Sequence, residues 1–542
     1  MNVFTTLDWS VLILFFIALG TIIWWAIKQK QDSSEDYFLA GRNLGWFVIG
    51  ASIFASNIGS EHIVGLAGTA ADSGMAMGHY ELHSWIILLL GWVFVPFYLR
   101  STVFTMPEFL ERRYSESARW ILTIITLVSY VLTKVSVTVY AGAVVFETLM
   151  GIEFWSGALL IILVTGAYTI LGGLRAVIYT DALQAMVLLF GSITITVTGL
   201  MKIGGWGNLI DEVGSSHFNM FLPYDHPDFP WVGMVFAPPI IGIWYWCTDQ
   251  YIVQRVLSAK NERQARKGTI FAGYLKLLPI FMFFIPGLIA YAMSKSGQLN
   301  YQSSDQVFPT LVRELLPSGV RGLVAGGLIA ALMSSLSSVF NSCSTLFTID
   351  IYKKLKPNTS EKKLVFVGRV ATAVVVVTGI LWIPLMKVVS SGGLYTYLQS
   401  VQAYIAPPIA AVFLLGLFWS RINSSGALAA LIGGFSAGMI RLGLEIKKSS
   451  LSGFWFDFAN LNFLYFAIFS FLSCIATLII VSILTPAPDY DKLEGLTYET
   501  TLSTDKENSK NSWNNIDVLN SAIIIAIVLM ILLYFSPIGI GG

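Results

Sequence analysis

Long runs of apolar residues, separated by short polar stretches, recur along the whole 542-residue chain. A helix that spans the hydrocarbon core of a bilayer needs ~20 predominantly apolar residues, and about fourteen segments meet that criterion. The pattern therefore predicts an all-α integral membrane protein with about fourteen transmembrane helices. The expected segments are 8–28, 44–70, 77–99, 118–149, 154–172, 177–201, 232–254, 266–294, 318–352, 364–386, 394–419, 424–446, 460–485 and 517–537.

The composition agrees with a chain that is mostly surrounded by lipid. Charged residues make up 12% of the sequence and hydrophobic residues 55%, whereas soluble domains average about 25% charged residues. The net charge of +1 argues against nucleic acid as a partner, because such proteins carry a basic surface. The first apolar segment has no basic region before it and no cleavage pattern after it, which predicts a retained helix rather than a signal peptide.

Lysine and arginine are unevenly divided between the two sets of alternate loops. Most of the 33 Lys and Arg residues fall in one set, which includes Arg112, Arg113, Lys353 and Lys354. Loops rich in these residues lie in the cytoplasm, so we expect both termini outside and a cytoplasmic linker at 486–516. The absence of long outer loops that could carry glycans favours a bacterial inner (plasma) membrane.

Two of the predicted spans have small or polar residues at their centre, at 55–62 and at 242–250. Interrupted helices at matching positions of two halves indicate a secondary transporter built from inverted repeats; the alternative is a pair of kinks between closely packed helices. We expect an extra N-terminal helix at 1–32, a first five-helix repeat at 33–203, an outer loop at 204–231, a second repeat at 232–419 and accessory helices at 420–542.

Two ionisable residues lie where a membrane protein rarely places them. Lys276 is about ten residues from either end of its span, too far for its amine to reach the interface easily. An ionisable residue inside a span is a functional-site hypothesis by default, although a structural pair with a buried acid would also explain it. Glu81 begins the third span, where its carboxylate could accept two solute hydroxyls or lie at the interface.

The ninth span carries a cluster of four serines, Ser334, Ser335, Ser337 and Ser338. Na⁺ is a hard cation that prefers oxygen ligands, so Ser334 and Ser335 could complete a sodium site with carbonyls of the first interruption. Ser337 and Ser338 could form a second site with Asp181. The alternatives are close helix packing for the serines and a helix cap for Asp181.

Several stretches carry a resemblance to a known family. These are Glu35–Arg42, Phe54–Ser60, Trp244–Gln250 with Val253–Arg255, and the stretch Phe340–Thr348. On these motifs the sequence resembles the sodium/solute symporter family, most closely its sodium/glucose and sodium/myo-inositol cotransporter branch, over most of 33–420. The resemblance implies a leucine-transporter-type fold with inverted five-helix repeats and alternating access driven by inward Na⁺ movement.

The resemblance also implies roles for individual residues. Position 242 is Gly, where relatives carry a polar residue, and Glu61 is typical of the inositol-like branch, so the two departures leave glucose and inositol open as solutes. The second sodium site is present in only some members, and its residues here imply two Na⁺ per solute. The implied residues are Asn57, His62, Glu81, Tyr245, Trp246, Lys276 and Gln399 for the sugar; Leu66, Tyr80, Tyr245 and Tyr395 for the gates; Ala55, Ile58, Ala331, Ser334 and Ser335 for the first sodium; and Asp181, Ser334, Ser337 and Ser338 for the second.

The chemistry of the implied site suits a glucose- or galactose-like sugar. A pyranose has an apolar face and a rim of hydroxyls, which fit an aromatic floor surrounded by a few polar side chains. We therefore expect a Na⁺-coupled sugar symporter, with a polyol symporter, a sugar-gated sensor or channel, and H⁺ coupling as alternatives. A membrane enzyme would need a carboxylate pair or metal site near a soluble face, and the sequence shows neither. No obligatory protein partner is evident.

Overall fold

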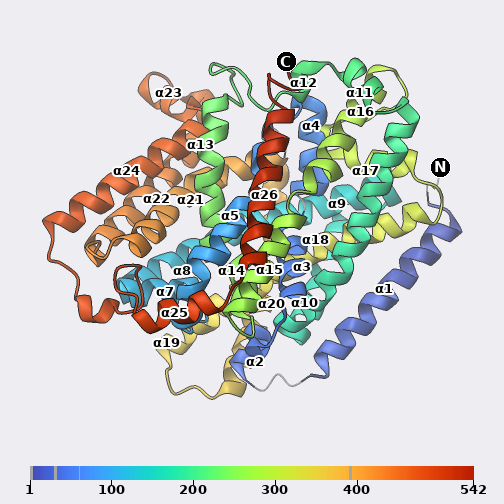
Figure 1. Ribbon diagram of the computed structural model, residues 1–542. Coiled ribbons are helices and arrows are strands. Elements are labelled where there is room, and N and C mark those ends of the chain that lie inside the picture. The colour runs from blue at the N-terminus through green and yellow to red at the C-terminus, as the bar shows by residue number, and fades with distance from the viewer. Residues whose placement is uncertain (1–3, 30–32, 60, 390–393) are drawn as a thin grey trace.

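The computed structural model describes residues 4–29, 33–59, 61–389 and 394–542, and Figure 1 shows that they form a bundle of helices. No β-strand occurs among these residues. Twelve helical stretches in them are long and apolar enough to cross a membrane. The all-α membrane architecture is therefore confirmed, whereas the expected count of about fourteen spans is not.

The difference in count arises at two places. The expected span at 44–70 is divided into α3 (Trp46–Asn57), the π-helical η2 (Glu61–Leu66) and α4 (Ala67–Ser73). The expected spans at 154–172 and 177–201 instead form one stretch, α10 (Phe154–Ile203), with a non-helical kink at Gly173. The apolar pattern marks where the chain is in lipid, but it does not show whether neighbouring segments join.

The interruption expected near residue 245 is present. α13 (Trp231–Gly242) continues into a π-helical turn, η6 (Ile243–Thr248), and α14 begins at Gln250 and ends at Leu257. Asp249 between them has extended backbone, φ −80° and ψ 128°, and its side chain accepts a hydrogen bond from the amide of Tyr251. A side-chain acceptor at this position satisfies one of the amides at the start of a helix, so the chain restarts a helix here.

α18 (Val320–Thr345) lies at the centre of the bundle and is buried along almost all of its length. It packs against α10, α3 and α1 (Thr6–Ile27). Asp8 of α1 stabilises the first turn of α18. Its carboxylate accepts hydrogen bonds from the amides of Gly319 and Gly322 and pairs with Arg321 at 2.9 Å. This places the serine cluster of α18 opposite α3 and α10.

Two further elements complete the surroundings of the interrupted helices. α15 (Glu262–Leu275) packs against α3, and α21 (Leu394–Phe418) packs against η2 and η6. At the periphery α20 (Glu361–Val389), α22 (Ser424–Ile446), α24 (Phe463–Leu484) and α26 (Asn515–Tyr534) present much of their surface to lipid.

In Figure 1, α1 starts at the right-hand side of the bundle and runs downward, whereas α26 runs upward and ends at the top. The linker helix α25 (Ser503–Asn511) and α19 (Lys353–Leu355) lie at the opposite end.

Candidate functional site

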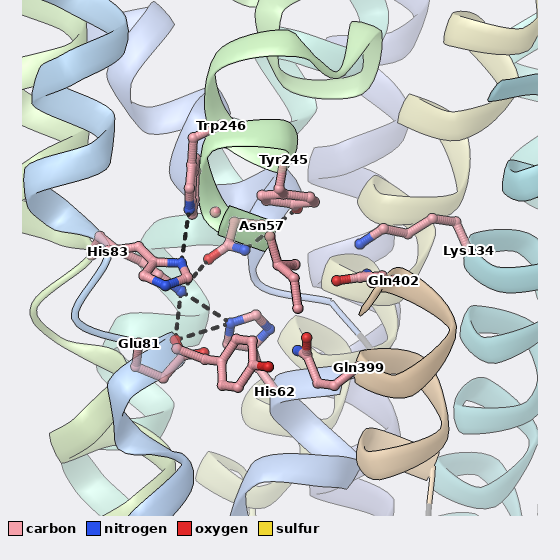
Figure 2. Close-up of a pocket in the computed structure, with 13 residues that line it drawn as sticks. Asn57, His62, Glu81, His83, Lys134, Tyr245, Trp246, Gln399 and Gln402 are labelled. Atoms are coloured by element: carbon pink, nitrogen blue, oxygen red, sulfur yellow. Dashed lines mark hydrogen bonds and ion pairs between the residues drawn. The ribbon is translucent and has the colours of Figure 1, made fainter. Parts of the chain in front are cut away.

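A cavity lies where the two interrupted helices meet (Figure 2). α3 contributes Asn57 from its last turn and η2 contributes His62. The remaining walls of the cavity come from η3 (Ala76–Tyr80) and the turn after it, η5 (Val131–Val135), the end of α13, η6, the residue after α15, and α21. The lining residues are Asn57, His62, Tyr80, Glu81, His83, Lys134, Ile241, Gly242, Tyr245, Trp246, Lys276, Gln399 and Gln402.

One side of the cavity is a buried network around Lys276. Its amine donates to Glu81 Oε2 at 2.6 Å and to Asn57 Oδ1 at 2.8 Å. His62 Nε2 lies 3.1 Å from the same carboxylate oxygen. Lys276 follows the last residue of α15, so the end of that helix directs the amine into the cavity. The pair with Glu81 compensates a charge that would otherwise be costly inside the membrane.

A second part of the cavity wall, next to this network, is aromatic. The rings of Tyr245 and Trp246 are perpendicular, with centroids 5.0 Å apart. Asn57 Nδ2 donates to the Tyr245 hydroxyl at 3.4 Å, and the Trp246 indole donates to His83 Nδ1 at 3.4 Å. Lys134 holds its amine 4.7 Å from the centre of the Tyr245 ring, within the range of a cation–π contact. The cavity therefore combines a flat apolar surface with converging donors and acceptors.

All seven residues expected at the sugar site line this one cavity, together with Gly242. The cavity is also lined by four residues that were not expected there from the sequence: His83, Lys134, Ile241 and Gln402. For Lys134 a signal was available, because an ionisable residue inside a span is the criterion that singled out Lys276. His83 lies near the start of the expected span at 77–99 and Gln402 is an uncharged amide, so neither stands out as a lysine at mid-span does.

The expected gate residues are distributed differently. Tyr80 and Tyr245 line the cavity, and Leu66 is buried at the end of η2 without being among the lining residues. The side chain of Tyr395 lies outside the described part of the structure.

A second polar cluster surrounds Asp181 in the middle of α10. Its carboxylate accepts hydrogen bonds from Ser334, from Ser52 at 2.7 Å and from Ser56 at 3.3 Å. The guanidinium of Arg255 lies 3.9 Å from the same carboxylate. All five side chains are buried. Asp181 is therefore not a helix cap, because it lies inside α10 and faces α3 and α18.

The remaining serines lie around this cluster. Ser338 Oγ is 3.4 Å from Ser56 Oγ and also accepts a hydrogen bond from Arg255. Ser337 donates to the carbonyl of Ser334 at 2.9 Å. The structure thus brings Asp181, Ser334 and Ser338 together across α10, α3 and α18. Ser52 and Ser56, which lie one turn apart on α3, complete the cluster and were not assigned to it from the sequence.

Of the residues expected at the first sodium site, Ser335 contacts the end of α3. Ser335 donates to the carbonyl of Ser56 at 3.4 Å, between Ala55 and the break that follows Asn57. Ile58 and Ala331 are both buried. An unwound helix end of this kind offers carbonyl oxygens to a cation. No group of three or more His, Cys, Asp or Glu side chains within the described ranges is arranged to hold a metal ion.

A buried polar cavity at the interruptions of two membrane helices, with a separate carboxylate–hydroxyl cluster beside it, defines a membrane transporter of the secondary-active class. The chain belongs to the Sodium:solute symporter family, whose model matches residues 37–434. It is accordingly an integral membrane protein and a Na⁺-coupled solute symporter, a transporter rather than an enzyme, with Na⁺ as the co-transported ion.

Similar proteins are found in both sugar and polyol branches. Sodium/glucose cotransporter 1 of Oryctolagus cuniculus is 39% identical over 533 residues, covering 89% of this chain and 80% of that protein. Sodium/myo-inositol cotransporter 2 of the same species is 38% identical over 531 residues, covering 91% and 79%.

The fold is shared with a solved structure of low sequence identity. A Na⁺-coupled sialic acid symporter in a substrate-bound outward-open state superimposes with a TM-score of 0.77 at 21% identity, covering 90% of this chain and 99% of that one. The sequence alone therefore identified both the class and the family correctly.

Proposed function

We propose that the protein couples inward Na⁺ movement to uptake of a glucose- or galactose-like sugar, and that the cavity around Lys276 is the sugar site. The observation that carries the proposal is the cavity itself, which joins an aromatic surface to amide, imidazole, carboxylate and ammonium groups within one buried space. A hydroxylated ring requires this combination of an apolar face and a polar rim. The sugar relatives support the same solute class.

Several of the lining residues have a specific role in this proposal. Glu81 accepts hydrogen bonds from sugar hydroxyls, while Lys276 and Asn57 donate. Gln399 contacts the hydroxyls from the α21 side. Tyr245 forms the floor and closes the cytoplasmic side, and the outer gate consists of Leu66, Tyr80 and Tyr395.

We propose two Na⁺ per sugar. The first binds at the end of α3, with carbonyls of Ala55, Ile58 and Ala331 and hydroxyls of Ser334 and Ser335. The second binds at Asp181 with Ser334, Ser337 and Ser338. Ser334 is a ligand of both proposed sites and donates a hydrogen bond to Asp181. Na⁺ in one site therefore changes the affinity of the other site for Na⁺. The ligands of each site come from different helices. Na⁺ therefore favours the conformation in which these helices bring the ligands together, because its affinity for that conformation is higher.

The domain boundaries and the orientation also belong to the proposal. We assign inverted repeats to 33–203 and 232–419, with the accessory helices outside them and no obligatory protein partner. The distribution of Lys and Arg supports a cytoplasmic position for the 486–516 linker and an outer position for both termini. We propose a bacterial plasma membrane on the basis of the short outer loops, although the relatives named above come from a mammal.

A polyol is the second candidate solute. The relatives that carry myo-inositol in their names match this chain almost as well as those that carry glucose, at 38% and 39% identity. An inositol ring presents hydroxyls around its whole rim, which the polar side of the cavity would also satisfy.

The test is uptake of labelled glucose into proteoliposomes with and without an inward Na⁺ gradient, with myo-inositol measured in parallel. Gradient-driven accumulation of glucose, with a Hill slope for Na⁺ clearly above one, is the expected result. Preferential accumulation of inositol would show that the solute is a polyol rather than a sugar. A Hill slope of one would contradict the second sodium site, and failure to accumulate any sugar or polyol would contradict the solute class.

A further inference from the structure

A second pocket, which shares no lining residue with the transport cavity, lies between the linker helix α25 and the α5–η4–α6 segment. α5 spans Ser84–Leu89, η4 Leu90–Phe94 and α6 Val95–Arg100. α25 lies at the end of the bundle opposite the point where α26 ends (Figure 1). None of its lining residues belongs to the proposed sugar or sodium sites, so its role does not depend on the proposed function.

The walls of the pocket are aromatic. Trp92 and Trp513 contact each other edge to face, with ring centroids 5.5 Å apart. Phe97 and Tyr498 do the same at 4.8 Å. In both pairs one ring comes from the α5–η4–α6 segment and the other from the 486–516 linker. The pocket is therefore formed by the contact between the linker and the bundle.

The rim of the pocket carries more positive than negative charge. Arg100, Lys506 and Lys510 line it together with one carboxylate, Asp505. Asp505 pairs with Arg100 at 3.5 Å, which leaves the two lysines to set the net charge. Lys506 and Lys510 are exposed and stand four residues apart, so they lie on one side of α25.

The pocket also adjoins the start of a candidate membrane span. α26, a candidate membrane span, begins two residues after Trp513. Its first turns expose apolar side chains, with Ile516 65% and Leu519 59% accessible. Tryptophan is typical of the membrane–water interface. A ligand in the pocket would therefore meet charge and aromatic rings at one end and an apolar helix surface at the other.

We propose that this pocket binds an anionic phospholipid. The phosphate lies between Lys506, Lys510 and Arg100, and the acyl chains run along the exposed face of α26. Clusters of basic residues next to a membrane helix attract lipids with a net negative headgroup. Because the aromatic and basic walls come from two segments more than 400 residues apart in sequence, the bound lipid also holds the linker against the bundle.

The experiment measures lipid retention by the full-length protein. The protein is purified from vesicles that contain equal amounts of phosphatidylglycerol and phosphatidylcholine, and retained lipid is counted by native mass spectrometry. The wild type is expected to retain phosphatidylglycerol several-fold over phosphatidylcholine. The variant Lys506→Gln/Lys510→Gln is expected to lose most of that preference.

The matched control is Lys362→Gln/Lys363→Gln, which removes two exposed lysines at the same end of the molecule but outside the pocket. It should retain the wild-type preference. Equal retention of both lipids by the wild type, or an undiminished preference in Lys506→Gln/Lys510→Gln, would overturn the proposal. Displacement of phosphatidylglycerol by an equal concentration of inorganic phosphate would overturn it in favour of a soluble anion.

Discussion

At the residue scale, Gln399 differs from most polar groups of the transport cavity. Lys276, Glu81 and Asn57 are already bonded to one another. The side-chain oxygen of Gln399 is buried and has no hydrogen-bond partner among the described residues. Burying an unsatisfied acceptor carries a cost, and a solute hydroxyl that donates to Gln399 would remove that cost.

We therefore expect Gln399→Ala to weaken solute binding. Loss of one hydrogen bond of about 1 kcal/mol corresponds to roughly a fivefold increase in the solute KM, with the Na⁺ dependence unchanged. Uptake into proteoliposomes measures both quantities. Gln298→Ala, an exposed residue outside the cavity, should behave like the wild type. An unchanged KM in Gln399→Ala would show that this side chain does not contact the solute.

A buried ion pair predicts a different kind of effect. Removing one partner leaves the other charge uncompensated, so Lys276→Met and Glu81→Gln should each lower the stability of the folded protein by about 3–5 kcal/mol. The double variant should recover much of that loss, because neither charge of the pair remains. Thermal unfolding in detergent measures this. A double variant less stable than either single variant would show that the two residues do not act as a pair.

Individual residues could be assigned from the sequence only where they were unusual. A lysine in the centre of an apolar span and four clustered serines were visible without any structure, and the family resemblance supplied the other expected residues. Their partners were not visible. Lys276 and Glu81 are 195 positions apart, and Ser52 carries no sign that it contacts Asp181 rather than a neighbouring helix.

At the element scale, helix interruptions were predictable but helix junctions were not. Small and polar residues at 55–62 and 242–250 marked both interruptions, because an unbroken apolar helix would not place them at mid-span. The junction inside α10 depends on a single residue. Gly173 adopts φ 56° and ψ −160°, a conformation available essentially only to glycine, and two adjacent glycines do not reveal which one takes it.

Gly173→Ala should therefore destabilise the protein. An added Cβ would lie 2.8 Å from the backbone oxygen and ring of Tyr37, and the positive φ adds strain of about 1 kcal/mol or more. We expect a lower melting temperature in detergent and less folded protein.

Gly20→Ala is the control for this variant. Gly20 lies within α1, and nothing is within 4 Å of the position its Cβ would take. Alanine favours a helix over glycine by up to about 1 kcal/mol, so this variant should be neutral or slightly stabilised. Equal stability of Gly173→Ala and Gly20→Ala would contradict the strained role of Gly173.

At the scale of the whole molecule, the proposed orientation can be tested by labelling. The three cysteines are all buried, so the background reaction with a membrane-impermeant maleimide should be low. Lys447→Cys, after α22, should react in intact cells. Lys363→Cys, at the start of α20, should react only after the membrane is made permeable. The reverse pattern would invert the proposed topology.

The bonded state of the transport cavity has a consequence for the thermodynamics of uptake. A solute hydroxyl that approaches Lys276 or Glu81 must break a contact of 2.6 Å before it makes its own, so at this corner binding is an exchange with little net heat. A hydroxyl that meets Gln399 displaces no protein partner. Calorimetry with a series of deoxy sugars should therefore show that removing different hydroxyls reduces the heat of binding by unequal amounts. The largest reduction is expected for the hydroxyl that faces Gln399. Such a series would show which way round the solute lies in the cavity.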